Sequence, residues 1–305
     1  MDSKQDWGLV LAGGGGKGAY EIGAWKALRE KKNLNISAVS GTSVGALNAA
    51  LFSAGNYEKA KEIWEKQINE EVILSPNFFK KKDVLKRMED MLKETREWEM
   101  ELPDLAVSLS WLVRQAAKRG AFTRKGLIQI IRQNGILPEV QKSNIPCYAA
   151  CYNLTKKKVE YFLLQQKKPR EILEILLASS ALPFIFPPEE MYGMQYWDGG
   201  LQDNVPIQPL YEAGYRKILI IHLDEKKTGN FFSLTKFMSE KNPFIADESS
   251  EYQDATLIHF YPQKSLSGFL GTLDFKPKTI QRKINQGYME TKKYLEQHSL
   301  HGSYL

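Results

Sequence analysis

The sequence has few of the residues that mark several common classes of protein. Its 305 residues include two cysteines and four histidines, and every histidine lies at or after position 222. No apolar run approaches the roughly 20 residues that a membrane-spanning helix needs. The first apolar run, residues 9–12, is too short for the core of a signal peptide. We therefore expect a cytoplasmic protein, with peripheral contact to a membrane as the alternative.

A strong charge of either sign is also missing. The chain carries 42 basic and 36 acidic residues, which leaves a net charge of +6. The basic residues are scattered apart from short runs at 80–82 and 156–158, and no nucleic-acid reader motif is present. Nucleic acid is therefore excluded as the expected partner. The two runs are interpreted as solvated loop or helix ends, with weak attraction to anionic lipid headgroups as the alternative.

The two cysteines, Cys147 and Cys151, lie in a stretch that predicts a strand, residues 145–152. Residues four apart on a strand share a face but are separated by about 13 Å. A disulfide requires Cα atoms within about 7 Å. We therefore expect two buried free thiols, as in a reducing compartment, and no metal site that uses them.

Apolar runs between turn residues predict an α/β fold. Strands are expected at residues 7–12, 36–39, 145–152, 158–164, 194–197, 217–223 and 256–261, and helices at 19–31, 44–54, 169–180 and 277–297. The order over residues 7–54 is strand, glycine loop, helix, strand, serine turn, helix. This order is a βαβ unit, which implies a parallel sheet.

Two longer segments are less regular. Residues 57–142 are charged and mostly helical by periodicity, and within them residues 102–113 are apolar. The apolar stretch is interpreted either as a lid or acyl-chain wall or as an ordinary buried helix. Residues 226–250 are polar and predict a loop.

The serine turn is the strongest single indication of chemistry. Ser43 is the centre of a Gly-x-Ser-x-Gly sequence formed by Gly41, Thr42, Ser43, Val44 and Gly45. Between a strand and a helix, this sequence makes a tight elbow that exposes the serine. The start of the following helix also favours negative charge. Ser43 is therefore the candidate nucleophile of an acyl hydrolase.

The glycine loop after the first strand has three interpretations. It consists of Gly13, Gly14, Gly15, Gly16, Lys17 and Gly18. A dinucleotide fingerprint also needs an acidic residue at the end of the second strand, where Ser40 stands, and a P-loop needs Ser or Thr where Gly18 stands. An oxyanion hole formed by backbone amides is the remaining interpretation. Lys17 is expected to order the loop or to lie at the surface.

A nucleophilic serine needs a base. The order Ser43, Asp198, His222 would suit a Ser–His–Asp triad. His222 lies at the end of a strongly apolar predicted strand, however, and is more simply interpreted as a core histidine. Asp198, which begins an Asp-Gly-Gly turn with Gly199 and Gly200, would be the acid of that triad.

Taken together, these motifs resemble the patatin-like phospholipase family. The resemblance rests on the glycine loop, the serine turn, residues 178–183, residues 186–188, the Asp-Gly-Gly turn and residues 204–206, in that order along the chain. It implies a Ser43–Asp198 dyad that needs neither histidine nor metal nor any other cofactor, with the oxyanion held by the glycine loop. It also implies a mostly parallel sheet in a three-layer α/β/α arrangement.

The resemblance further implies the domain organisation and the substrate class. Residues 7–211 would form the catalytic domain, residues 57–142 a helical cap within it, and residues 212–305 the strands and helix that complete the fold. The substrate would be a phospholipid, a lysophospholipid or a neutral acyl ester. Three alternatives stay open, namely an esterase that uses His222, a non-catalytic lipid-binding or regulatory protein, and a transacylase.

Overall fold

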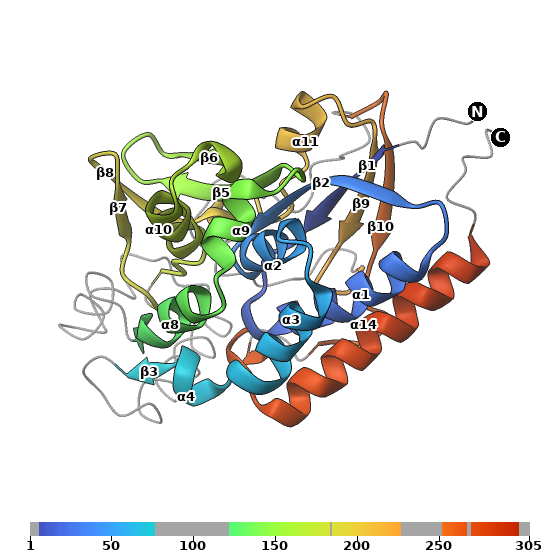
Figure 1. Cartoon of the computed structure of the whole chain (residues 1–305), viewed down its shortest axis with the longest axis horizontal. Coiled ribbons are helices and arrows are strands. Elements are labelled where there is room, and N and C mark those ends of the chain that lie inside the picture. The colour runs from blue at the N-terminus through green and yellow to red at the C-terminus, as the bar shows by residue number, and fades with distance from the viewer. Residues whose placement is uncertain (1–5, 77–121, 184, 227–251, 267–269, 299–305) are drawn as a thin grey trace, which may run out of the picture.

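The computed structural model describes residues 6–76, 122–183, 185–226, 252–266 and 270–298. Its centre is a mixed sheet of eight strands in the order β10-β9-β1-β2-β5-β8-β7, with β6 also paired to β5 (Figure 1). The parallel strands are β10 (Thr256–Phe260), β9 (Lys217–Ile221), β1 (Asp6–Leu11), β2 (Asn35–Thr42) and β5 (Cys147–Asn153). The antiparallel strands are β6 (Lys158–Leu163), β8 (Met194–Asp198) and β7 (Glu189–Met191). The predicted mostly parallel sheet is confirmed.

The central strands are apolar on both faces because both faces are covered, as is usual for parallel strands. On one face, Leu9 and Leu219 belong to the main core together with side chains of the larger helices. On the other face, Val10 and Ile220 pack against Ile207 and Leu210 at the short helix α11 (Gln208–Glu212). The sheet therefore lies between two helical layers of unequal thickness.

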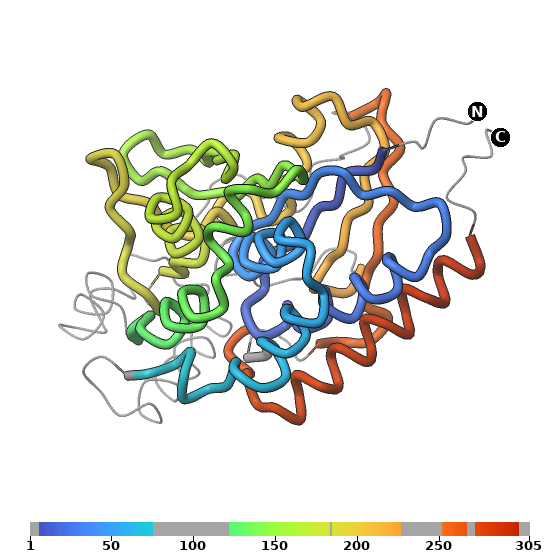
Figure 2. Tube along the Cα trace, in the orientation of Figure 1, coloured from blue at the N-terminus to red at the C-terminus, as the bar shows by residue number. Residues whose placement is uncertain are grey.

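The thicker layer contains α1 (Ala19–Glu30), α2 (Val44–Ser53), α10 (Pro169–Ser179) and α14 (Pro277–Gln297). The long C-terminal helix α14 runs alongside α1, as the red and blue segments of Figure 2 show. Two glycines permit this contact, since a Cβ on Gly23 would lie 1.9 Å from the Ile284 carbonyl oxygen and one on Gly287 2.0 Å from that of Tyr20. The backbones of the two helices are therefore in direct contact.

The segment predicted as a helical cap is described at its two ends. The first end forms α3 (Tyr57–Glu62), a π-helical turn (Ile63–Gln67), α4 (Glu70–Ile73) and β3 (Ser75–Pro76). The second end forms β4 (Phe122–Thr123), α8 (Lys125–Gln133) and α9 (Ile136–Lys142), and β3 pairs with β4. These parts are mostly helical as predicted. The apolar stretch 102–113, the basic run 80–82 and nearly all of the predicted loop 226–250 lie outside the described residues.

Further expectations concern the cysteines, the membrane and the domains. Cys147 and Cys151 are both free and buried, as predicted. None of the helices in the described ranges reaches the length and hydropathy that a bilayer crossing requires. Strands β9 and β10 lie in the same sheet as β1, while the domain boundary near residue 211 stays a prediction.

Candidate active site

Ser43 occupies a strained turn between β2 and α2. Its φ of 57° and ψ of −125° are unusual for a residue with a side chain, and such a conformation costs on the order of 1–3 kcal/mol. The flanking glycines are required by packing. A Cβ on Gly41 would lie 2.2 Å from the Gly45 carbonyl oxygen, and one on Gly45 would lie 2.2 Å from the Leu11 carbonyl oxygen. The turn therefore has the geometry expected for a nucleophile elbow.

The backbone amide of Ser43 is held by a second serine. Its N–H donates to the Ser179 hydroxyl over 3.0 Å, and that hydroxyl donates to the Ala150 carbonyl over 2.7 Å. Ser43 stands at the N-terminal cap of α2, yet its side chain makes no capping hydrogen bond. The amide therefore fixes the elbow, and the hydroxyl is left for another partner.

The sheet register places Asp198 next to Ser43. Thr42, the last residue of β2, pairs with Ala150, and Asp198, the last residue of β8, pairs with Cys151. Because Ala150 and Cys151 are successive residues of β5, the ends of β2 and β8 lie next to each other. The Ser43 side chain consequently lies beside the Asp198 carboxylate, and its hydroxyl lowers the pKa of that carboxyl group. A catalytic dyad of the two residues stays a prediction.

Asp198 is almost fully buried, and this burial raises its pKa from 3.8 to about 7. Three partners oppose the rise, in decreasing order the Ser43 hydroxyl, the Gly200 N–H and the charge of Arg124. The Gly200 amide donates to the carboxylate over 2.8 Å. An ordinary aspartate is a weak base toward a serine hydroxyl, but a carboxylate whose pKa is near 7 is matched to proton transfer at neutral pH.

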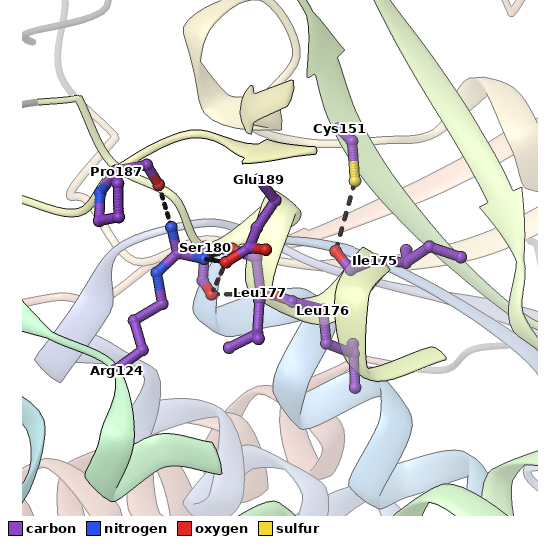
Figure 3. Close-up of polar contacts among 8 residues, drawn as sticks. All are labelled: Arg124, Cys151, Ile175, Leu176, Leu177, Ser180, Pro187 and Glu189. Atoms are coloured by element: carbon purple, nitrogen blue, oxygen red, sulfur yellow. Dashed lines mark hydrogen bonds and ion pairs between the residues drawn. The ribbon is translucent and has the colours of Figure 1, made fainter. Parts of the chain in front are cut away.

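Arg124 precedes α8 and fixes the chain beside the site. Figure 3 shows its guanidinium pointing at Leu177, Pro187 and Glu189. It donates to the Leu177 carbonyl and the Glu189 carboxylate over 2.7 Å each, and also to the Pro187 carbonyl. Burial lowers the pKa of Arg124 to about 10, which leaves it charged. Arg124 therefore connects the start of α8 to the end of α10 and to the start of β7.

Ser43 and Asp198 share one cavity of about 170 Å³. The polar part of its wall also includes Gly13, Gly14, Gly15, Lys17, Asn48, Ser180, Gly200, Asn204, Asp224 and Thr272. The remaining wall is aliphatic and aromatic. It comes from α2, the π-helical turn, the residue after it, α4, the residue after that helix, α8, α9, α10 and the residues Leu182, Ile185, Phe186, Leu273 and Phe275. Its apolar members include Leu47, Leu51, Ile63, Trp64, Ile73, Leu127, Ile131, Leu182, Phe186 and Phe275. An alkyl chain could be buried here with its polar end at Ser43.

The glycine loop lies against the serine turn, but its residues are not equivalent. Gly14 and Gly15 are partly exposed and line the cavity. The Gly13 amide donates to the Asn204 carbonyl and the Lys17 amide to the Gly14 carbonyl, each over 3.1 Å. Gly16 and Gly18 are buried residues of the loop. Gly14 and Gly15 are therefore the loop residues that are partly exposed at the cavity, and an oxyanion site in the loop stays a prediction.

The position of Lys17 differs from one of the two that the sequence predicts. Its side chain is 3% exposed and its ammonium lies 2.6 Å from the Asp224 carboxylate, so the predicted surface position is wrong. The ion pair with Asp224 is what allows this burial, because a buried charge needs a partner. A loop-ordering role is consistent with this ion pair.

His222 is outside the cavity wall that contains Ser43 and Asp198. Its Nε2 lies 2.9 Å from Nδ1 of His259, and its ring stacks on Tyr261 with centroids 4.0 Å apart. Burial and the neighbouring His259 lower the pKa of His222 to about 3. These contacts fit a core histidine. No metal-binding cluster of three or more His, Cys, Asp or Glu side chains occurs among the described residues.

Replacing Ser179 by alanine is expected to lower kcat about tenfold to a hundredfold. The change leaves the Ser43 amide without its acceptor, which costs roughly 1–3 kcal/mol, and the strained turn is the structure that this hydrogen bond supports. Steady-state kinetics with p-nitrophenyl butyrate measures the effect. Ser53→Ala is the matched control, because it removes a hydroxyl that donates to the Ile145 carbonyl at the other end of α2. Equal kcat values for the two variants would contradict the role of Ser179.

Known proteins are similar to this chain over most of its length. The family model described as patatin-like phospholipase matches residues 9–211. Lysophospholipase NTE1 of Cryptococcus neoformans is 28% identical over 218 residues, 71% of this chain and 11% of that protein. Probable lipid hydrolase 463L of Invertebrate iridescent virus 6 is 28% identical over 206 residues, 65% of this chain and 61% of that protein. The chain thus spans only part of the relatives' lengths.

One solved structure has a similar fold. VipD from Legionella pneumophila aligns over 96% of this chain and 67% of its own, with a TM-score of 0.51 and 18% sequence identity. At this identity the similarity concerns the fold alone.

Proposed function

The chain belongs to the patatin-like phospholipase family, and from this premise we propose that it hydrolyses acyl esters of lipids with Ser43 as nucleophile and Asp198 as base. One observation carries the proposal. Ser43 and Asp198 both line the polar part of one largely apolar cavity, and the Ser43 hydroxyl lowers the pKa of the Asp198 carboxyl group. The names of the two relatives, a lysophospholipase and a probable lipid hydrolase, support a lipid ester as the substrate class.

In the proposed first step, Oγ of Ser43 attacks the ester carbonyl carbon while its proton passes to the Asp198 carboxylate. The pKa of about 7 suits Asp198 to accept that proton. The carbonyl oxygen becomes an oxyanion, for which the amides of Gly14 and Gly15 are the candidate donors. The C–O bond to the leaving alcohol then breaks, and Asp198 returns the proton to that alcohol.

The second step hydrolyses the acyl-enzyme. Water, deprotonated by Asp198, attacks the acyl-Ser43 ester through a second tetrahedral oxyanion, and the fatty acid leaves as the Ser43 hydroxyl is restored. No histidine, metal or other cofactor is required. The alkyl chain of the substrate would lie along the apolar wall, where burial contributes roughly 25 cal/mol per Å². Contact with a membrane surface and a cytoplasmic location stay predictions from the sequence.

A substrate panel with measured fatty-acid release tests the proposal. The panel contains a lysophosphatidylcholine, a diacyl phosphatidylcholine, a triacylglycerol and p-nitrophenyl esters of butyrate, octanoate and palmitate. We expect hydrolysis of at least one lipid by the wild type. No turnover of any member by the wild type would exclude the enzyme and favour a protein that binds lipid without hydrolysing it.

Replacing His222 by alanine is expected to leave kcat within about threefold of the wild type. Its ring contacts His259 and Tyr261 rather than the cavity, so its loss should lower stability more than turnover. A triad would instead lose on the order of 10⁴-fold or more. The measurement is kcat on protein whose circular dichroism matches that of the wild type. A loss of that size in folded protein would establish the His222 esterase in place of the dyad.

A further inference from the structure

Lys283 is a buried cation beneath the glycine loop. It belongs to α14, beyond residues 9–211 that match the family model, and its exposed fraction is 0%. Lysine is almost never fully buried unless it is paired, because an uncompensated buried charge is costly. A fully buried lysine next to a catalytic loop therefore calls for an explanation.

The ammonium group of Lys283 binds two carbonyl groups. It donates to the carbonyl of Gly16 over 3.0 Å and to that of Asp274 over 3.1 Å. Gly16 lies in the middle of the glycine loop, directly after Gly15. The lysine thus connects the C-terminal helix to the backbone of the loop.

The contact fixes the loop through successive peptide planes. The carbonyl of Gly16 and the amide of Lys17 belong to one planar peptide, and its two ends point in opposite directions. Lys283 holds the carbonyl end, and the amide end donates to the Gly14 carbonyl over 3.1 Å. That carbonyl shares a second peptide with the amide of Gly15. The direction of the Gly15 amide is therefore coupled to Lys283 through two peptide planes.

Residues 272–287, near the C-terminal end of the described chain, also pack against the glycine loop and the helix after it. Gly15 has a φ of +55°, and a Cβ there would lie 2.2 Å from the Thr272 carbonyl oxygen. Helix α1 follows the glycine loop, and helix α14 carries Lys283. The close backbone contact of the two helices at Gly23 and Gly287 fixes their relative position. Residues 272–287 therefore restrict the conformation of the glycine loop.

The charge of Lys283 adds an electrostatic contribution. Burial lowers its pKa to about 8, Asp274 opposes this, and the like charges of Arg282 and Lys17 lower it further. Lys17 is in turn paired with Asp224. At neutral pH the group is still charged, and a fixed positive charge in a poorly solvated position favours a nearby oxyanion in the transition state.

We infer that Lys283 is a positioning residue of the oxyanion site, holding the glycine loop so that the amides of Gly14 and Gly15 face the tetrahedral intermediate. This inference rests on the proposed function, because it requires that an oxyanion forms at Ser43. Helix α14 lies outside residues 9–211, which match the family model. The inference gives this helix a role in catalysis.

The test compares Lys283→Met, which keeps the length of the side chain and removes both charge and donors, with Lys293→Met, the same change at an exposed position of α14. With p-nitrophenyl butyrate, Lys283→Met is expected to lower kcat about tenfold to a hundredfold, somewhat less than the loss of a direct oxyanion donor, while KM stays within about threefold. The rate at which a fluorophosphonate labels Ser43 should fall by a similar factor. Lys293→Met should match the wild type.

Stability measurements separate positioning from folding. Lys283→Met removes a buried charge but also leaves the carbonyls of Gly16 and Asp274 without this donor, so the unfolding temperature of each variant is measured and kcat is compared at a temperature where the variants are folded. Lys283→Arg, which retains the charge and the donors, should recover most of kcat. An unchanged kcat in folded Lys283→Met, a change confined to KM, or the failure of both variants to fold would each overturn the inference.

The outcomes for the two proposals are distinguishable. If Ser43 is labelled and Ser43→Ala is inactive while Lys283→Met behaves like the wild type, only the role of Lys283 is wrong. If the wild type is not labelled at Ser43 and Ser43→Ala retains turnover, the proposed function itself is wrong.

Discussion

Replacing Asp198 by asparagine is expected to abolish ester hydrolysis, with a fall in kcat on the order of 10⁴-fold, as for other enzymes that lose a carboxylate of the catalytic unit. Asparagine has nearly the same shape and keeps an oxygen that can accept the Gly200 amide. It cannot accept the proton of Ser43. Steady-state kinetics measures the loss. Asp254→Asn is the matched control, because Asp254 is an exposed aspartate paired with Arg216, and its kcat should equal that of the wild type. Turnover near the wild-type value in folded Asp198→Asn would remove Asp198 from the mechanism.

The same substitution is expected to stabilise the folded protein above pH 7. The pKa of Asp198 is about 7 in the folded state against 3.8 for an unperturbed aspartate. Between these values the folded protein keeps a proton that the unfolded chain has released, so the free energy of unfolding falls as the pH rises. A rise of about three pKa units corresponds to about 4 kcal/mol, and asparagine removes this cost.

Unfolding experiments on the wild type and Asp198→Asn at a series of pH values measure this effect. The difference in the free energy of unfolding isolates Asp198, because the other titrating groups are common to both proteins. It should be small near pH 4, grow up to about pH 7 and stay constant above it. A difference that does not depend on pH would show that the carboxylate is not destabilised by its burial.

Replacing Ser43 is expected to have the largest effect on activity. In other serine hydrolases, loss of the nucleophile costs about 10⁶-fold in kcat, and we expect Ser43→Ala to lose at least 10⁴-fold on every substrate that the wild type cleaves. Residual turnover would come only from binding and the oxyanion site. Fatty-acid release measures the loss. A Ser43→Ala variant that cleaves lipid esters at a rate comparable to the wild type would contradict the assignment of the nucleophile.

A glycine at the same position separates activity from stability. At the φ of 57° of Ser43 a side chain is strained, whereas glycine adopts such angles freely. Ser43→Gly should therefore be as inactive as Ser43→Ala yet more stable than it by about 1 kcal/mol. Equal stability of the two variants in urea unfolding would indicate that the turn is not strained.

The positions of the secondary-structure elements could largely be predicted from the sequence because the signals are local. Apolar runs mark β1 and β9, and the Gly-x-Ser-x-Gly sequence marks the end of β2 and the start of α2. Gly55 adopts a φ of +78° just after α2, as expected for a helix terminator. The βαβ order also places the glycine loop and Ser43 at one edge of the sheet. These features depend on residues close together in the chain.

The assembly of the site could be predicted only in part. Asp198 was a candidate through a resemblance, whereas its proximity to Ser43 depends on the register of β8 on β5, which local patterns do not encode. The burial of Lys17 depends on Asp224, about 200 residues later in the chain. Such contacts are fixed by tertiary packing rather than by spacing.

Three further residues were missed for the same reason. Ser179 was seen only as part of the stretch 178–183, and neither Arg124 nor Lys283 belongs to a motif. Lys283 has one signal that could have been noticed. It lies on the face of a predicted helix that also contains Ile280, Ile284 and Gly287, all buried, where a charged residue interrupts the apolar pattern.

Covalent labelling tests the central claim most directly. The wild type is treated with a fluorophosphonate probe, digested and mapped by mass spectrometry. The account predicts one adduct, on Ser43, which is absent from Ser43→Ala and forms much more slowly in Asp198→Asn. An adduct on a different residue, or hydrolysis of lipid esters by a wild-type protein that takes up no probe at Ser43, would contradict it.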